Sequence, residues 1–272
     1  MEPFDREHPH RPYYREKEGA DTIVIFIHGF FGSPSQFWDL SAIAWEKGYS
    51  IASLLLPGHG GSGREFTRTP GRQWVRFTMQ RIRRYAYQYR RVLVVGHSMG
   101  GLLALHASLF PENHVAGVFL LNTPLSIHFT ARGTKNGLKA VFAPQKYLDV
   151  VSRSYRQGNS VQRMAIPQYL QMLPRVADLQ KLMVRVREEL PQVRVPVTII
   201  QSRRDETVKW RSAIDLSFGM SQAPCRVVWL QSSWHSYYTS GEKEVVEREF
   251  RWFLERSLEN SGEESCWVMT KN

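Results

Sequence analysis

The sequence is poor in cysteine, contains no long apolar stretch and has no block of five or more like charges. Its two cysteines, Cys225 and Cys266, cannot build a disulfide framework or a four-ligand zinc site. No apolar run approaches the roughly 20 residues needed to cross a bilayer. The charged segment 1–18 also lacks the apolar core of a secretory signal. These absences exclude membrane-spanning and disulfide-rich secreted classes and predict a soluble protein of the cytoplasm.

Basic residues are in excess, and the excess is uneven along the chain. The 272 residues carry a net charge of +11. Between Leu125 and Leu190 there are 11 Lys and Arg against 4 Asp and Glu, so this stretch alone supplies +7. A basic protein is a candidate for nucleic-acid binding, but neither zinc-finger spacing nor an RNA-recognition signature accompanies the charge. We therefore expect no nucleic-acid partner.

Short apolar runs alternate with helical patterns along most of the chain, which is typical of a parallel α/β sheet. Residues 22–27 (TIVIFI) are continuously apolar, as expected for a strand covered on both faces. Strands are expected at residues 22–27, 50–55, 92–95, 115–121, 197–200 and 226–230. Helices are expected at residues 35–47, 72–89, 99–110, 208–218 and 242–258. The sequence therefore predicts the α/β class, with a mostly parallel central sheet and helices on both faces.

The alternation stops in the middle of the chain. Residues 125–190 contain no convincing strand, and their helical pieces are expected around 138–142 and 179–190. The stretch is too long for a structureless loop, because such connections rarely exceed about 15 residues. We predict a core of residues 1–124 and 191–258, a helical cap of residues 125–190 over the carboxyl ends of the strands, and a polar tail of residues 259–272.

The motif with the clearest chemistry is Gly96-His97-Ser98-Met99-Gly100, which fits G-x-S-x-G. An expected strand leads into the motif and an expected helix follows it. A nucleophile on so tight a turn needs neighbours without a Cβ atom, which the two glycines provide. The pattern predicts a nucleophilic Ser98 above the start of the helix, the alternative being a serine of structural role.

A serine hydroxyl needs a base and an oriented acid to become a nucleophile. Among nine histidines, His235 follows the last expected strand in a short loop before the C-terminal helix. Asp205 follows the strand at 197–200, with Glu206 as its close rival and a helix N-cap as its alternative role. His28 and His59 lie in turns where a structural role is expected. The order Ser98, Asp205, His235 is the one found in α/β-hydrolases.

Acyl transfer also requires donors for the developing oxyanion. One donor is expected to be the backbone N–H of Met99, the residue after the nucleophile. The second is expected in the turn His28-Gly29-Phe30-Phe31-Gly32, where the glycines allow the Phe30 N–H to face the site.

These motifs resemble those of the α/β-hydrolase fold superfamily of serine hydrolases. Over roughly residues 20–258 the chain is most similar to small bacterial carboxylesterases and monoacylglycerol lipases, through HGFFG, PGHGGSG, GHSMG, SRRDETV and a late S-x-x-H. The resemblance implies a catalytic triad of Ser98, Asp205 and His235, with Phe30 and Met99 as oxyanion donors. Trp234 is a departure, because relatives usually have a small residue before the histidine.

The sequence thus predicts a serine hydrolase that cleaves carboxylic esters of small molecules through an acyl-enzyme, without metal or cofactor. An amidase or peptidase on the same triad and a non-catalytic binding protein of the same fold are the alternatives. The charge of residues 125–190 further predicts a preference for esters with an anionic group, or a weak association with an anionic lipid surface. The alternative there is a solvated cap whose charges point away from the site.

Overall fold

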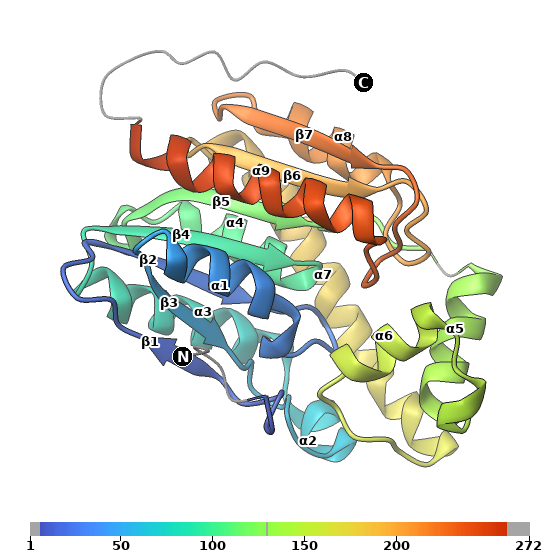
Figure 1. Ribbon diagram of the computed structural model, residues 1–272. Coiled ribbons are helices and arrows are strands. Elements are labelled where there is room, and N and C mark those ends of the chain that lie inside the picture. Colours follow the sequence, from blue (N-terminus) through green and yellow to red (C-terminus); the bar gives the residue numbers. More distant parts are fainter. Residues whose placement is uncertain (1–5, 129, 260–272) are drawn as a thin grey trace.

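The computed structural model describes residues 6–128 and 130–259 (Figure 1). Its strands form one sheet in the order β1-β3-β2-β4-β5-β6-β7, parallel except for β1, which pairs antiparallel with β3. The strands are β1 Tyr13–Arg15, β2 Thr22–Ile27, β3 Ser50–Leu54, β4 Arg91–His97, β5 Val115–Leu121, β6 Val197–Ser202 and β7 Cys225–Leu230. The predicted mostly parallel sheet is confirmed. The tail predicted at 259–272 lies outside the described residues except for Glu259.

Helices cover both faces of the sheet, as predicted. In Figure 1, α1 and α9 lie on the near face, and α3, α4 and α7 lie behind the sheet. The helices outside the region between β5 and β6 are α1 Trp38–Glu46, α2 Gly63–Arg68, α3 Gly71–Ala86, α4 Met99–Ser108, α8 Arg211–Gly219 and α9 Ser240–Glu259. Short 3₁₀ turns are η1 Pro34–Phe37 and η2 Pro111–Asn113.

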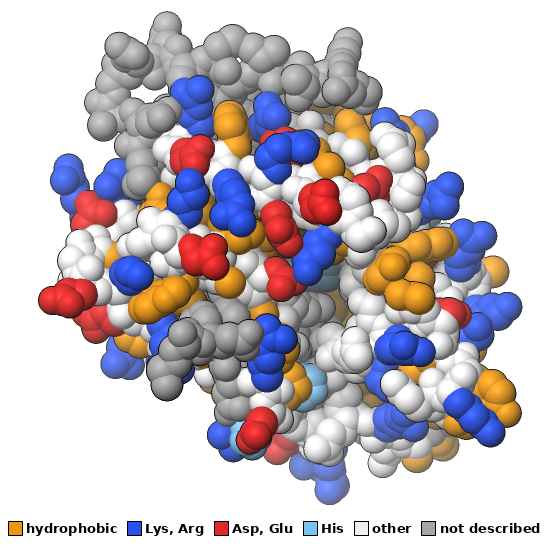
Figure 2. Space-filling view, viewed as in Figure 1, with side chains coloured by type: hydrophobic (Ala, Val, Ile, Leu, Met, Phe, Trp, Pro, Cys, Tyr) orange, Lys and Arg blue, Asp and Glu red, His pale blue; other side chains and the backbone are white. Residues whose placement is uncertain are grey.

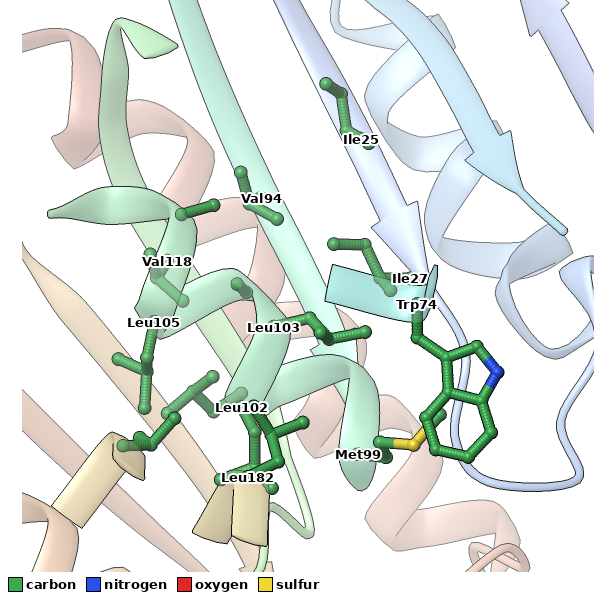
Figure 3. Close-up of a cluster of buried hydrophobic side chains, with 14 of the residues drawn as sticks. Ile25, Ile27, Trp74, Val94, Met99, Leu102, Leu103, Leu105, Val118 and Leu182 are labelled. Carbon is green, nitrogen blue, oxygen red and sulfur yellow. The ribbon is translucent and has the colours of Figure 1, made fainter. Parts of the chain in front are cut away.

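The two faces of the sheet contribute to two buried clusters. Successive residues of a strand point to opposite faces, so in β2 Val24 and Phe26 pack with Phe250 of α9, whereas Ile25 and Ile27 join the other cluster. Figure 3 shows this second cluster, in which Leu102 and Leu103 of α4 lie between the sheet and Leu182. This burial explains why the strands read as continuous apolar runs.

The chain between β5 and β6 is helical. It contains α5 Ala131–Phe142, α6 Val150–Gly158 and α7 Leu173–Glu189, with 3₁₀ turns η3 Gln145–Tyr147, η4 Ile166–Met172 and η5 Leu190–Gln192. In Figure 1, α5 and α6 lie to one side of the sheet, whereas α7 runs back behind it against α4. The division into core and cap stays a prediction. None of the helices among the described residues is both long and apolar enough to span a membrane.

Candidate active site

Ser98 lies at the turn between β4 and α4 and has a backbone that few residues other than glycine adopt. Its φ is 52° and its ψ is −122°. A Cβ atom at Gly100 would overlap the Ile27 carbonyl oxygen, and one at Gly96 would overlap the backbone of Gly100. The turn is therefore as tight as the sequence motif predicts, and it presents Ser98 at the amino end of α4.

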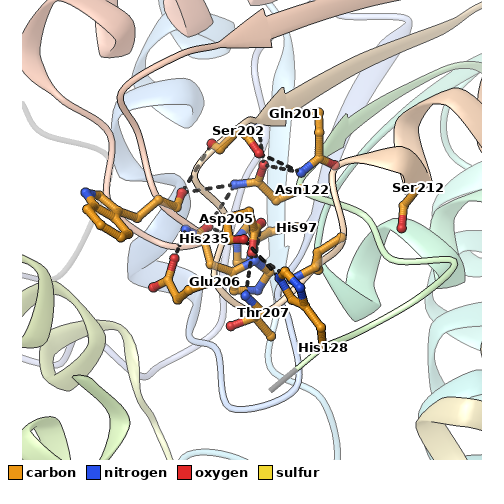
Figure 4. Close-up of polar contacts among 12 residues, drawn as sticks. His97, Asn122, His128, Gln201, Ser202, Asp205, Glu206, Thr207, Ser212 and His235 are labelled. Carbon is orange, nitrogen blue, oxygen red and sulfur yellow. Dashed lines mark hydrogen bonds and ion pairs between the residues drawn. The ribbon is translucent and has the colours of Figure 1, made fainter. Parts of the chain in front are cut away.

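Asp205 and His235 meet although they lie on different loops. Asp205 follows β6, His235 follows β7, and the Asp205 Oδ2 atom is 2.8 Å from His235 Nδ1 (Figure 4). The other oxygen of Asp205, Oδ1, accepts the backbone N–H groups of Thr207 at 2.8 Å and Val208 at 2.7 Å. The Asp205 side chain is 0% exposed. The carboxylate therefore has a fixed orientation and directs the other ring nitrogen of His235, Nε2, away from itself.

The surroundings of His235 favour its protonated form. Burial alone lowers the pKa of His235, but the charge and hydrogen bond of Asp205, followed by the charge of Glu206, outweigh burial and raise it. A histidine with a raised pKa is a stronger base. The pair can therefore take up a proton at Nε2 and stabilise the resulting imidazolium.

The backbone of His235 is also fixed by hydrogen bonds. Its carbonyl oxygen accepts from His97 Nε2 at 3.0 Å and from Asn122 Nδ2 at 2.9 Å. Its N–H donates to Glu206 Oε2 at 3.2 Å. Sequence reasoning missed Asn122, although a polar residue directly after the apolar strand β5 is a signal for it.

His97, the residue directly before Ser98, holds the His235 loop close to the Ser98 turn. The ring centroids of His97 and His235 are 4.9 Å apart. Burial, followed by the neighbouring His235, lowers the pKa of His97 to about 4. His97 is therefore neutral near pH 7 and carries its proton on Nε2, where it donates to the His235 carbonyl.

The turn after β2 lies against Ser98. A Cβ atom on Gly29 would stand 3.0 Å from Ser98 Cβ. The Gly29 carbonyl accepts from Gly32 N–H at 3.0 Å and from His28 Nδ1 at 2.9 Å. Because a trans peptide points its C=O and N–H in opposite directions, the Phe30 N–H faces away from these donors. The Met99 N–H is at the first position of α4, where helices leave N–H groups free.

His28 and His59 support this turn, in line with the structural roles expected for them. His28 Nε2 accepts the Leu56 N–H at 3.0 Å, which leaves the proton of its ring on Nδ1. His59 Nε2 lies 2.7 Å from the Phe30 carbonyl oxygen. Burial lowers the pKa of both rings. Within residues 6–128 and 130–259, no three His, Cys, Asp or Glu side chains are grouped so as to hold a metal ion.

A basic cavity of about 440 Å³ lies beside the His235 loop. Its lining includes Arg132, Lys135 and Lys139 of α5, together with Trp234. The Arg132 guanidinium lies 5.0 Å from the centre of the Trp234 ring, and Lys139 Nζ pairs with Asp149 Oδ2 at 2.9 Å. The unusual Trp234 thus lines a cavity together with three cations of α5.

Known proteins share this architecture. A family model described as "Alpha/beta hydrolase family" matches residues 24–248. A thermostable monoacylglycerol lipase of Bacillus sp. (strain H-257) is 25% identical over 252 residues, or 91% of this chain and 92% of that protein. A carboxylesterase of Bacillus subtilis (strain 168) is 20% identical over 245 residues, or 88% of this chain and 94% of that protein. A solved structure from work on LipS and LipT, two metagenome-derived lipolytic enzymes, has a TM-score of 0.69 at 21% identity, covering 91% of this chain and 98% of its own.

Proposed function

The chain belongs to the alpha/beta hydrolase family, as its motifs predicted, and we propose that it hydrolyses carboxylic esters through an acyl-enzyme on Ser98. The relatives named monoacylglycerol lipase and carboxylesterase support ester hydrolysis. The observation that carries the triad is the 2.8 Å contact between Asp205 and His235. The Asp205–His235 pair lies beside His97, which immediately precedes Ser98 and donates to the His235 backbone.

The proposed roles are those of a Ser-His-Asp triad and its two oxyanion donors. His235 Nε2 takes the Ser98 Oγ proton as Oγ attacks the ester carbonyl, and Asp205 stabilises the imidazolium. The Phe30 and Met99 N–H groups stabilise the tetrahedral oxyanion, each worth roughly 3–4 kcal/mol in a preorganised site. The imidazolium then protonates the leaving alcohol. Water hydrolyses the acyl-enzyme with His235 again as base, so no metal or cofactor enters any step.

We further propose that residues 125–190 cap the site and favour esters with an anionic group. Figure 2 shows Lys and Arg side chains gathered on the side of the molecule where α5 and α6 lie. Three of these cations line the cavity beside Trp234, adjacent in sequence to His235. The same charge also supports a weak association with an anionic lipid surface. The cytoplasmic location and the absence of a nucleic-acid partner stay predictions.

The reaction class is tested with matched substrates. An ester and its amide isostere are compared with the purified chain, and the ester series is extended to longer acyl groups. We expect turnover of the ester at least about 10²-fold faster than the amide, since the alcohol is the better leaving group. Comparable turnover of the amide would favour an amidase. No turnover of either, across the whole series, would favour the non-catalytic alternative.

A further inference from the structure

Glu206, next to the proposed acid Asp205, is a buried carboxylate with no part in the triad. Its residue exposure is only 4%. Its Oε2 atom accepts the His235 backbone N–H at 3.2 Å, and its Oε1 atom accepts the hydroxyl proton of Tyr155. Two consecutive carboxylates therefore bind one histidine, Asp205 through the ring and Glu206 through the backbone.

Tyr155 belongs to α6, which contacts two loops of the site through successive residues. Tyr155 contacts Glu206 in the loop after β6, and Ser154 contacts the His235 loop after β7. Beside the Tyr155 contact, Ser154 Oγ donates to the Ser236 carbonyl at 2.7 Å. Just after α6, Ser160 donates from its backbone N–H to the Phe31 carbonyl at 3.0 Å and from Oγ to the Gly32 carbonyl. The α6 segment thus joins the loop of the proposed base to the turn of the proposed oxyanion donor.

We propose that Glu206 is a positioning residue that links α6 to His235 and adds a second negative charge beside the imidazolium. The proposal rests on the proposed role of His235 as base. The hydrogen bonds fix the position of the His235 backbone, while the charge acts on its ring through space. A glutamate that only joins α6 to the His235 loop would fix the position of the backbone without its charge affecting the His235 ring.

Among the described residues, Asp205 and Glu206 are the charged groups that raise the pKa of His235. His97, in ring contact, is neutral near pH 7. Burial, followed by the charge of Glu206, raises the pKa of Tyr155, so its hydroxyl keeps its proton and donates. Burial, followed by the charge of Asp205, likewise raises the pKa of Tyr238. The cation of Arg132 lies over the neighbouring Trp234 ring.

The test is the pH dependence of kcat/KM and kcat for a neutral ester. Glu206→Gln removes the charge and retains a side chain of the same shape. We expect its acid limb to move to lower pH by about half a unit or more, because the pKa of His235 falls when a neighbouring negative charge is lost. At the plateau, kcat falls by about 3- to 10-fold with KM little changed. The reason is that the imidazolium formed in the reaction is less stable without the charge, and one pKa unit corresponds to a tenfold change in that stability.

Two further variants separate charge from contact. Tyr155→Phe breaks the link to α6 and keeps the Glu206 charge, so kcat falls by about 3-fold or more while the acid limb does not move to lower pH. Glu249→Gln is the matched control. Glu249 is also buried, with 6% exposure, but it pairs with Arg226 and not with the His235 loop, and its variant keeps the wild-type pH profile.

An acid limb of Glu206→Gln that coincides with wild type would overturn the proposal. Thermal unfolding and fluorophosphonate labelling show that the variant is folded. If Glu206→Gln does not fold, the decision passes to Tyr155→Phe, for which an unchanged kcat overturns the proposal. Failure of the wild-type chain to label with fluorophosphonate or to hydrolyse any ester would instead refute the proposed function, so the two failures are distinguishable.

Discussion

Asp205 binds the ring of His235 across a sequence separation of 30 residues, with 2.8 Å between Oδ2 and Nδ1. Its remaining oxygen is occupied by two backbone N–H groups. Asparagine at this position loses the charge and favours the wrong ring tautomer. We predict that Asp205→Asn lowers kcat for a neutral ester by about 10⁴-fold. Asp215→Asn, on the exposed surface of α8, is the control and retains wild-type activity.

We predict that protonation of His235 sets the acid side of the activity profile. Because the base must be neutral and its pKa is raised, kcat/KM is predicted to fall as pH drops through a value above the ordinary 6.5. The raised pKa also means that protonation of His235 stabilises the fold at low pH. The measurement is kcat/KM from pH 5 to 9 beside circular dichroism. Loss of activity that tracks unfolding would contradict this assignment.

Alanine variants of three histidines close to the site distinguish a catalytic role from a structural role. We predict that His235→Ala lowers kcat by several orders of magnitude, whereas His59→Ala and His97→Ala cost far less and act mainly on stability. For His97, whose pKa is lowered to about 4, the folded state favours the neutral ring. Its contribution to stability is therefore present above pH 6.5 and lost as pH falls towards 4. A His59→Ala variant as inactive as His235→Ala would move the base assignment.

Most of the fold is predictable because buried parallel strands have a distinctive pattern. Each residue of β2 is buried, so its bounds follow from the apolar run alone. The strand β1 was missed because it has three residues at an antiparallel edge. The helix α6 was missed because its sequence, VVSRSYRQG, is largely polar. It begins where Asp149 accepts the Ser152 N–H, and its contacts to the His235 loop are not visible in the local pattern.

The residues of the candidate site are also partly predictable from the sequence. Ser98, Asp205 and His235 follow from motif and strand order, and their catalytic roles stay predictions. Asn122 was missed although it directly follows an apolar strand, because its partner, the His235 carbonyl, lies on a distant loop. Tyr155 was not found, because it acts through a contact between segments far apart in the sequence. Such contacts depend on how the loops after β5, β6 and β7 approach one another, which residue types and spacing do not encode.

The space around two glycines, one at the Ser98 turn and one in α5, predicts opposite effects of alanine on stability. Alanine at Gly100 would place its Cβ against the backbone of Ile27 and His28, which cannot move aside. We predict that Gly100→Ala destabilises the fold by about 3 kcal/mol or more and abolishes activity. Gly137, inside α5, has open space around its Cβ position, so Gly137→Ala stabilises by about 0.5–1 kcal/mol. Chemical denaturation compares both, and a neutral Gly100→Ala would contradict the geometry of the turn.

The basic cavity predicts a charge preference among substrates. We expect kcat/KM for a carboxylate-bearing ester to fall by about 10-fold in Arg132→Ala/Lys135→Ala, and its neutral isostere to be unaffected. The wild-type preference should weaken at high salt, as the Debye length falls below about 10 Å. Lys146→Ala is the control, because Lys146 carries the same charge outside the cavity lining. If kcat/KM of the two esters changed equally with salt, the cations would not attract the anionic substrate.

The proposed acyl-enzyme requires Ser98 as the nucleophile. The most direct measurement of this role is covalent labelling by a fluorophosphonate, with the modified residue located by peptide mass spectrometry, in the wild type and in Ser98→Ala. We predict one label on Ser98 in the wild type, and neither label nor ester turnover in a Ser98→Ala variant that unfolds like the wild type. Labelling at another residue, or turnover retained by Ser98→Ala, would show that Ser98 is not the nucleophile.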